Sequence, residues 1–75
     1  MRERKIKLDP ERAREFVSVS SKCDFDIDVF YNRVIIDAKS ILGVLGLDFN
    51  KELTVQYAGY DNNFENIISK YAITG

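Results

Sequence analysis

Residues 20–47 read SSKCDFDIDVFYNRVIIDAKSILGVLGL, and this stretch decides the fold. Its first part, residues 24–29, alternates strictly between carboxylates and apolar side chains. Successive side chains of a β-strand point to opposite faces, so the alternation predicts a strand with one buried face and one wet face. The same residues have the D-x-D-x-D spacing of a calcium loop, but that loop needs glycine where Val29 stands and glutamate where Ile35 stands. We therefore expect no metal site.

The next residues predict a hairpin followed by a short helix. Asn32 lies in the turn, and asparagine tolerates the positive φ that tight turns require, whereas Arg33 suits it less well than glycine would. The chain should then continue as a strand over Val34–Asp37. Ser40 opens an almost wholly apolar segment of helical length, residues 40–47, which contains two glycines. Because glycine disfavours helix, this helix should be short and held by tertiary contacts.

Two elements are expected before this stretch. Residues 4–8 alternate charged and apolar side chains and predict the first strand. Asp9 then supplies an N-cap oxygen and Pro10 suits the first helical position, so a helix should run from there to about Cys23. Its core-facing residues recur at spacings of three and four: Ala13, Phe16, Val17 and Ser20.

Two more elements are expected after it. Leu53–Tyr57 alternates again and predicts a fourth strand, after which Gly59 lets the chain turn. Asn62 and Glu65 have the spacing of a capping box at the start of a last helix. The buried stripe of that helix should consist of Phe64, Ile67, Ile68 and Tyr71.

The order of elements is therefore βαββαβα in one domain, residues 1–75. This order predicts an α+β fold, an open-faced sandwich in which helices cover one face of a four-stranded antiparallel sheet.

Composition limits the function classes. The formal net charge of −1 hides an asymmetry, because residues 1–22 hold seven Lys or Arg against four acids, but neither half is basic enough to favour nucleic-acid binding. No apolar segment approaches the roughly 20 residues that cross a membrane, and the amino terminus lacks the apolar centre of a secretory signal. We expect a cytoplasmic protein whose single cysteine, Cys23, is buried or half-buried.

Residues 20–47 resemble the central part of bacterial HPr proteins, the phosphocarriers of the sugar phosphotransferase system. There a helix ending in A-S-K is followed by a hairpin and then by K-S-I-x-G-V-x-S-L, and the two sequences match without a gap. The residues that carry the resemblance are Lys39, Ser40, Ile41, Gly43, Val44 and Leu47. With the last strand and helix, it covers about three quarters of the chain. The resemblance implies an HPr-like fold and a bacterial protein.

The chain departs from that family where its chemistry lies. HPr proteins carry glycine, the phosphorylated histidine, alanine, arginine and proline in a loop before the first helix. Here residues 8–12 run directly into the helix, and the chain contains no histidine. We interpret residues 9–12 as a shorter connection. Phosphohistidine transfer needs the missing nitrogen nucleophile, and no other catalytic pair or phosphate-binding loop has a recognisable motif. We expect neither an enzyme nor a cofactor.

Ser40 corresponds to the serine that a dedicated kinase phosphorylates in HPr proteins of many Gram-positive bacteria. Two interpretations remain open. Ser40 is an N-cap whose Oγ accepts from the backbone N–H of Leu42 or Gly43, or it is also a regulatory phosphorylation site.

Ile41, Leu42 and Leu45 match the apolar residues that HPr proteins expose to dock enzyme I, the serine kinase and a catabolite-control repressor. They also fit a second interpretation, as residues that cover the sheet edge or enter the core. The sequence thus supports a regulatory module that docks to other proteins. By resemblance, its partners would be an HPr serine kinase, an enzyme I or a catabolite-control repressor. The alternative is a structural domain that self-associates through these three residues.

Overall fold

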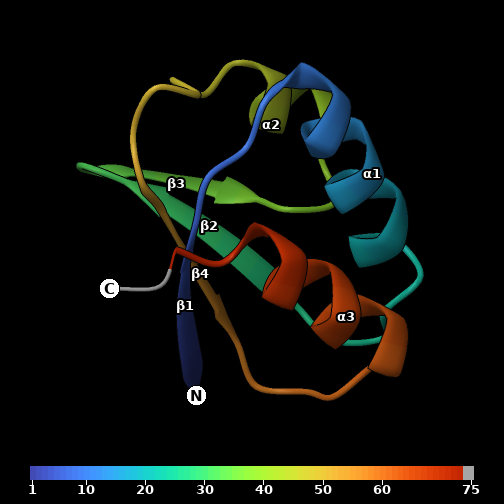
Figure 1. Ribbon diagram of the computed structural model, residues 1–75. Helices are drawn as coiled ribbons and strands as arrows, with labels where there is room; N and C mark the ends of the chain where they lie inside the picture. Colours follow the sequence, from blue (N-terminus) through green and yellow to red (C-terminus); the bar gives the residue numbers. More distant parts are fainter. Residues whose placement is uncertain (74–75) are drawn as a thin grey trace.

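The computed structural model describes residues 1–73, which form four strands and three helices in the predicted order (Figure 1). The elements are β1 (Arg2–Ile6), α1 (Pro10–Ser20), β2 (Ile27–Tyr31), β3 (Val34–Asp37), α2 (Ile41–Leu45), β4 (Leu53–Tyr57) and α3 (Asn62–Tyr71). The strands form one sheet in the order β1-β4-β2-β3, and every neighbouring pair is antiparallel. The predicted α+β sandwich is confirmed.

The helices cover one face of the sheet, with α1 and α3 along it and α2 beside the end of β3 (Figure 1). Along β4, Leu53, Val55 and Tyr57 are buried, whereas Thr54 and Gln56 on the other face stay half-exposed. The core between sheet and helices includes Ile6, Phe16, Ile27, Val29, Val44, Leu53, Val55, Tyr57, Phe64 and Ile68. Nearly every periodic apolar residue is used, as a chain of this size requires.

Helix α1 begins as predicted and ends earlier. The Asp9 carboxylate accepts a hydrogen bond from the N–H of Arg12 at 2.8 Å, and Pro10 occupies the first turn. All four predicted core-facing residues are buried. The expectation that the helix reaches Cys23 is wrong, because the last N–H groups bond to carbonyls only three residues back, Lys22 to Val19 and Cys23 to Ser20. This tighter turn ends the helix at Ser20.

The first two strands are shifted from their predicted positions. The first occupies Arg2–Ile6 rather than residues 4–8, because its last partner is Leu53, where β4 begins. The second begins at Ile27 rather than at residue 24, because Ile27 pairs with Tyr57, where β4 ends. In both cases the length of β4 decides which of the alternating residues pair with a neighbouring strand.

The hairpin follows the prediction. Tyr31 pairs with Val34 across a two-residue turn. Asn32 has φ 54°, and it is the one non-glycine residue among residues 1–73 with a positive φ. Arg33 therefore avoids the conformation that made it an unfavourable turn residue.

The last helix is capped one residue earlier than predicted. Asp61 is extended, with φ −146°, and its carboxylate accepts from the N–H of Phe64 at 2.9 Å, so Asn62 is the first helical residue. The predicted capping box is wrong, and Glu65 instead forms an ion pair with Arg2 at 3.3 Å. The predicted buried stripe is confirmed.

Residues 71–73 lie along the outer edge of β1. Ile6 and Ala72 form an isolated antiparallel bridge. The N–H of Lys7 donates to the Tyr71 carbonyl at 3.1 Å, and the N–H of Ile73 donates to the Lys5 carbonyl at 2.9 Å. This edge of the sheet is therefore partly covered. Within residues 1–73, none of the helices has the length and apolar character needed to cross a bilayer.

Candidate functional site

Ser40 is the N-cap of α2. Its backbone is extended, and its Oγ accepts from the N–H of Gly43 at 3.3 Å, one of the two donors expected from the sequence. Its carbonyl accepts from Val44 N–H at 2.9 Å, the first bond of the helix. The residue is exposed, so its hydroxyl is accessible from solvent while it caps the helix.

The turn after β3 fixes the position of Ser40. Its N–H donates to the Asp37 carbonyl at 3.0 Å, and the Lys39 N–H donates to the Asp37 carboxylate at 2.9 Å. The Lys39 ammonium reaches the Cys23 carbonyl at 2.9 Å and so joins this turn to the end of α1. Ser40 is thus held by a hydrogen-bonded turn.

Gly43 allows α2 to lie close against β3. A Cβ at this position would stand 2.8 Å from Cγ2 of Ile36 and 3.2 Å from Oγ of Ser40. Those distances are shorter than ordinary van der Waals contacts. Val44, on the inner side of the helix, is fully buried. The resemblance matched both residues, and the structure shows that both position the short helix.

The three predicted partner-binding residues do not form one exposed patch. Leu42 is 83% exposed and Ile41 is 39% exposed. Leu45 is half-buried and packs against the core, because it lies on the inner side of the turn. Only Ile41 and Leu42 therefore present apolar surface beside Ser40. We call Ser40, Ile41 and Leu42 the α2 surface.

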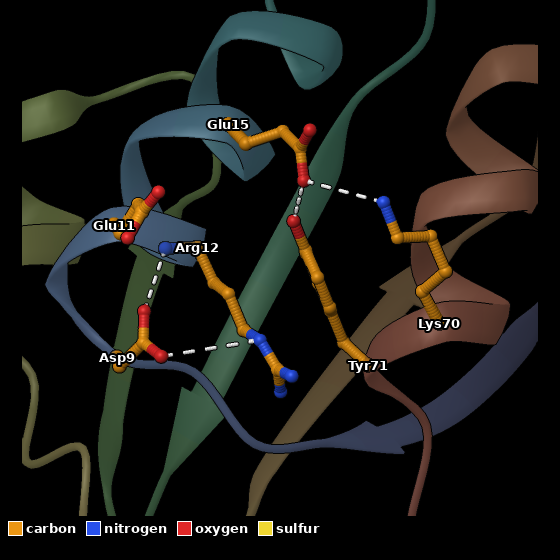
Figure 2. Close-up of a pocket in the computed structure, with 6 residues that line it drawn as sticks. All are labelled: Asp9, Glu11, Arg12, Glu15, Lys70 and Tyr71. Carbon is orange, nitrogen blue, oxygen red and sulfur yellow. Dashed lines mark hydrogen bonds and ion pairs between the residues drawn. The ribbon is translucent and has the colours of Figure 1, made fainter.

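A hollow of about 570 Å³ lies between the start of α1 and the end of α3 (Figure 2). Its lining residues are Asp9, Glu11, Arg12, Glu15, Lys70 and Tyr71. It lies beside the short connection where the HPr resemblance would place the histidine loop. The connection is short, as interpreted from the sequence, but it consists of residues 7–9 rather than 9–12, because α1 already begins at Pro10.

The polar groups of this hollow bind mainly to one another (Figure 2). Arg12 lies near the Asp9 carboxylate at 3.9 Å and over the Tyr71 ring at 5.2 Å from its centroid. The Tyr71 hydroxyl donates to Glu15, which also has the Lys70 ammonium at 3.9 Å. No imidazole is present, and the arrangement ties the two helices together.

Cys23 is buried, as expected from the sequence. Burial chiefly, and then the carboxylates of Asp61 and Asp24, raise the pKa of its thiol, while the Lys39 ammonium opposes them. The Sγ atom lies 3.6 Å from the Val19 carbonyl. A protonated, buried thiol is a weak nucleophile, so Cys23 fits a structural role.

The sequence analysis did not predict that two apolar residues of β3 are exposed. Val34 is 45% exposed and Ile35 is 63% exposed. The available signal was three successive apolar residues, 34–36, in a strand that has only one covered face. Such a strand must leave at least one apolar side chain in solvent.

The comparison with solved structures supports the α+β fold described above. No protein-family model matches the chain. Among solved structures, the chain is similar to Crh, the catabolite repression protein of Bacillus subtilis, with a TM-score of 0.63 and 21% sequence identity. The match covers 93% of this chain and 88% of Crh, whose crystal structure is an intertwined dimer with a swapped domain. The chain therefore has the HPr-like α+β fold of Crh.

Proposed function

We propose that the chain is a non-catalytic regulatory module of the HPr type, which acts in the cytoplasm by docking to other proteins through the α2 surface. The observation that carries this proposal is the pairing of Leu42, 83% exposed, with the exposed hydroxyl of Ser40 on one short helix. Leu42 and its neighbour Ile41, 39% exposed, make this apolar surface contiguous, and a contiguous apolar surface is where a partner protein can dock.

The absence of histidine supports docking rather than phosphate transfer. The chain has none at any position, so it lacks the nitrogen atom that accepts the phosphoryl group in HPr proteins. The hollow beside α1 offers carboxylates, a guanidinium, an ammonium and a phenol. The phenol is bound to a carboxylate, and the guanidinium and ammonium each lie near one. We therefore assign no catalytic residue and no cofactor.

Phosphorylation of Ser40 would regulate the docking. A phosphate adds nearly two negative charges. At the amino end of a helix these charges are tolerated by the helix dipole, so the domain can stay folded while its surface changes from neutral to anionic. The N-cap role does not prevent this, because the capping bond uses one lone pair of an exposed oxygen.

The test is the intact mass of the protein after incubation with ATP and an HPr serine kinase. The proposal predicts one added phosphate on the wild type and none on Ser40→Ala. Ordinary HPr in a parallel reaction verifies that the kinase is active. If HPr is phosphorylated and the wild type is not, regulation through Ser40 is ruled out. The proposal would then be reduced to docking that does not depend on phosphorylation.

The alternative function is a self-associating structural domain. The observation that favours it is the intertwined dimer formed by Crh, the protein of similar fold. It predicts a dimer that weakens in a Leu42→Lys variant while Ser40 stays unmodified. The docking module instead predicts that this variant loses partner proteins and keeps its own oligomeric state.

A further inference from the structure

The two edges of the sheet differ in how they are covered. Residues 71–73 bond to the outer edge of β1. Over residues 1–73, the outer edge of β3 has no strand beside it, because β3 pairs with β2 alone. An uncovered edge presents backbone N–H and C=O groups to other strands.

The register of the hairpin shows which groups face that edge. Tyr31 and Val34 close a two-residue turn and therefore exchange both backbone hydrogen bonds. The same alternation continues to Ala38, whose N–H donates to the Ile27 carbonyl at 2.9 Å. Val34 and Ile36 consequently bond inward to β2. The N–H and C=O of Ile35 point to the free edge.

The side chains of β3 do not protect this edge. Edge strands are usually guarded by lysine, proline or a bulge. Val34, Ile35 and Ile36 are all apolar, and Ile35 lies on the open face of the sheet opposite Phe30. The charged residues stand only at the two ends, Arg33 before the strand and Asp37 at its last position.

We propose that β3 pairs antiparallel with β3 of a second copy of this chain, centred on Ile35. The two Ile35 residues then face each other and exchange backbone hydrogen bonds. Arg33 stands opposite Asp37 of the second copy, and this pair occurs twice by symmetry. Among registers that pair outward-facing residues, only this one brings Arg33 and Asp37 together. Charge complementarity therefore selects both the occupant and the register.

The charges on the open face of the sheet also favour this pairing of β3 with β3. Asp28 and Asp37 are directly opposite each other in the hairpin, an unfavourable arrangement of like charges. Among the ion pairs within residues 1–73, none involves Asp28, Asp37 or Arg33. In the dimer, Arg33 of the second copy comes next to this pair of carboxylates and offsets their repulsion. Ile35 of both copies and the adjacent Phe30 side chains form an apolar strip beside it.

Sedimentation velocity over a concentration series tests the pairing. Because the interface is small, association should appear between about 10 μM and 1 mM. Ile35→Lys should weaken it at least tenfold. Leu42→Lys is the matched control, since it places the same charge at another exposed apolar position, 83% exposed against 63% for Ile35, and it should leave association unchanged.

Charge exchange tests the register. Arg33→Asp sets two carboxylates opposite each other at both ends, and Asp37→Arg sets two guanidinium groups there, so each variant alone should associate several-fold more weakly than the wild type. In an equimolar mixture both end pairs are complementary again, and association should return as a heterodimer. Circular dichroism checks that Asp37→Arg folds without its hydrogen bond to Lys39. If it does not fold, Ile35→Lys still decides the outcome.

Three results would overturn the inference: a wild type that stays monomeric at about 1 mM, association lost in Leu42→Lys but kept in Ile35→Lys, or a charge-exchange mixture of folded variants that stays monomeric. A monomeric wild type would overturn this inference alone, because phosphorylation of Ser40 does not require two copies of the chain.

Discussion

Gly59 lies against the ring of Phe25, and a Cβ placed there would overlap ring carbons. That ring lies 6.2 Å from the rings of both Tyr57 and Phe64, so it has little room to move aside. Gly46 is different, because its nearest neighbours would be 3.5 Å from a Cβ. The two glycines therefore serve different purposes, close packing in one case and the end of a short helix in the other.

Gly59→Ala should lower the free energy of unfolding by about 1–3 kcal/mol, the usual cost of overpacking a core. Gly46→Ala is the matched control and should change it by less than about 0.5 kcal/mol, as surface substitutions usually do. Urea denaturation monitored by circular dichroism measures both. Equal effects of the two substitutions would contradict the packing argument.

The two buried tyrosines should respond oppositely to loss of their hydroxyl groups. The buried hydroxyl of Tyr57 lies beside the Glu65 carboxylate but forms no hydrogen bond of acceptable geometry among the described residues, whereas the hydroxyl of Tyr71 donates to Glu15. Tyr57→Phe should be neutral or stabilising, and Tyr71→Phe should cost about 1 kcal/mol. Thermal unfolding of the two variants distinguishes them, and a larger loss in Tyr57→Phe would show that its hydroxyl has a partner.

Alkaline pH should weaken the fold through two residues. Burial, followed by neighbouring carboxylates, raises the pKa of Cys23, and burial with Glu65 beside it raises the pKa of Tyr57. The folded state thus keeps these protons to higher pH than the unfolded state does. Their stabilisation is complete below the ordinary pKa of 9.0 for the thiol and 10.0 for the phenol, and it is lost as pH rises toward the folded values.

The free energy of unfolding should therefore decline above about pH 9, with the thiol contributing first. Urea titrations at several pH values measure the slope, and Cys23→Ala should make the first part of the decline shallower. A slope that is the same in this variant would rule out the contribution of the thiol.

At the scale of the elements, Asp61 rather than Asn62 determines where α3 begins. Asp61→Ala should cost about 1 kcal/mol, because the N–H of Phe64 loses its acceptor. Asn62→Ala, at the first exposed helical position, should cost less than half of that. Chemical denaturation of the two variants gives the comparison, and a larger effect at Asn62 would restore the capping box that the sequence predicts.

The elements themselves could be predicted from local patterns, and their ends could not. Alternation predicted β1, β2 and β4, and the three- and four-residue spacings predicted α1 and α3. The β3 strand was predicted from the turn at Asn32, and α2 from the apolar segment that Ser40 opens. The limits of β1 and β2 depend on β4, a strand far away in the sequence. Local spacing carries no information on where a distant partner begins or ends.

At the scale of the whole molecule, the fold was the most predictable feature and the surface the least. The alternation in the strands, the spacing in the helices and the capping residues all favour the same architecture. A fold can be predicted from its sequence when these local signals agree. For the α2 surface, sequence spacing could not tell which side of a single helical turn faces the core. Leu45 therefore turned inward while Leu42 stayed in solvent.

The free edge of β3 could not be predicted either, because local sequence does not show which strand lies at the border of the sheet. Apolar residues in a strand usually signal burial, and only the strand order shows that Ile35 lies at the border of the sheet, on its open face. The molecule thus offers two surfaces with separate roles. The α2 surface is proposed to bind regulatory partners, and the β3 edge to bind a second copy.

The central claim is that the α2 surface binds partner proteins, and binding to purified candidates tests it most directly. Isothermal titration with an HPr serine kinase, an enzyme I and a catabolite-control repressor should show that at least one binds the wild type. Leu42→Lys should weaken that binding at least tenfold, while Ile35→Lys should leave it unchanged. No binding to any of the three, or equal binding by the wild type and Leu42→Lys, would contradict the account.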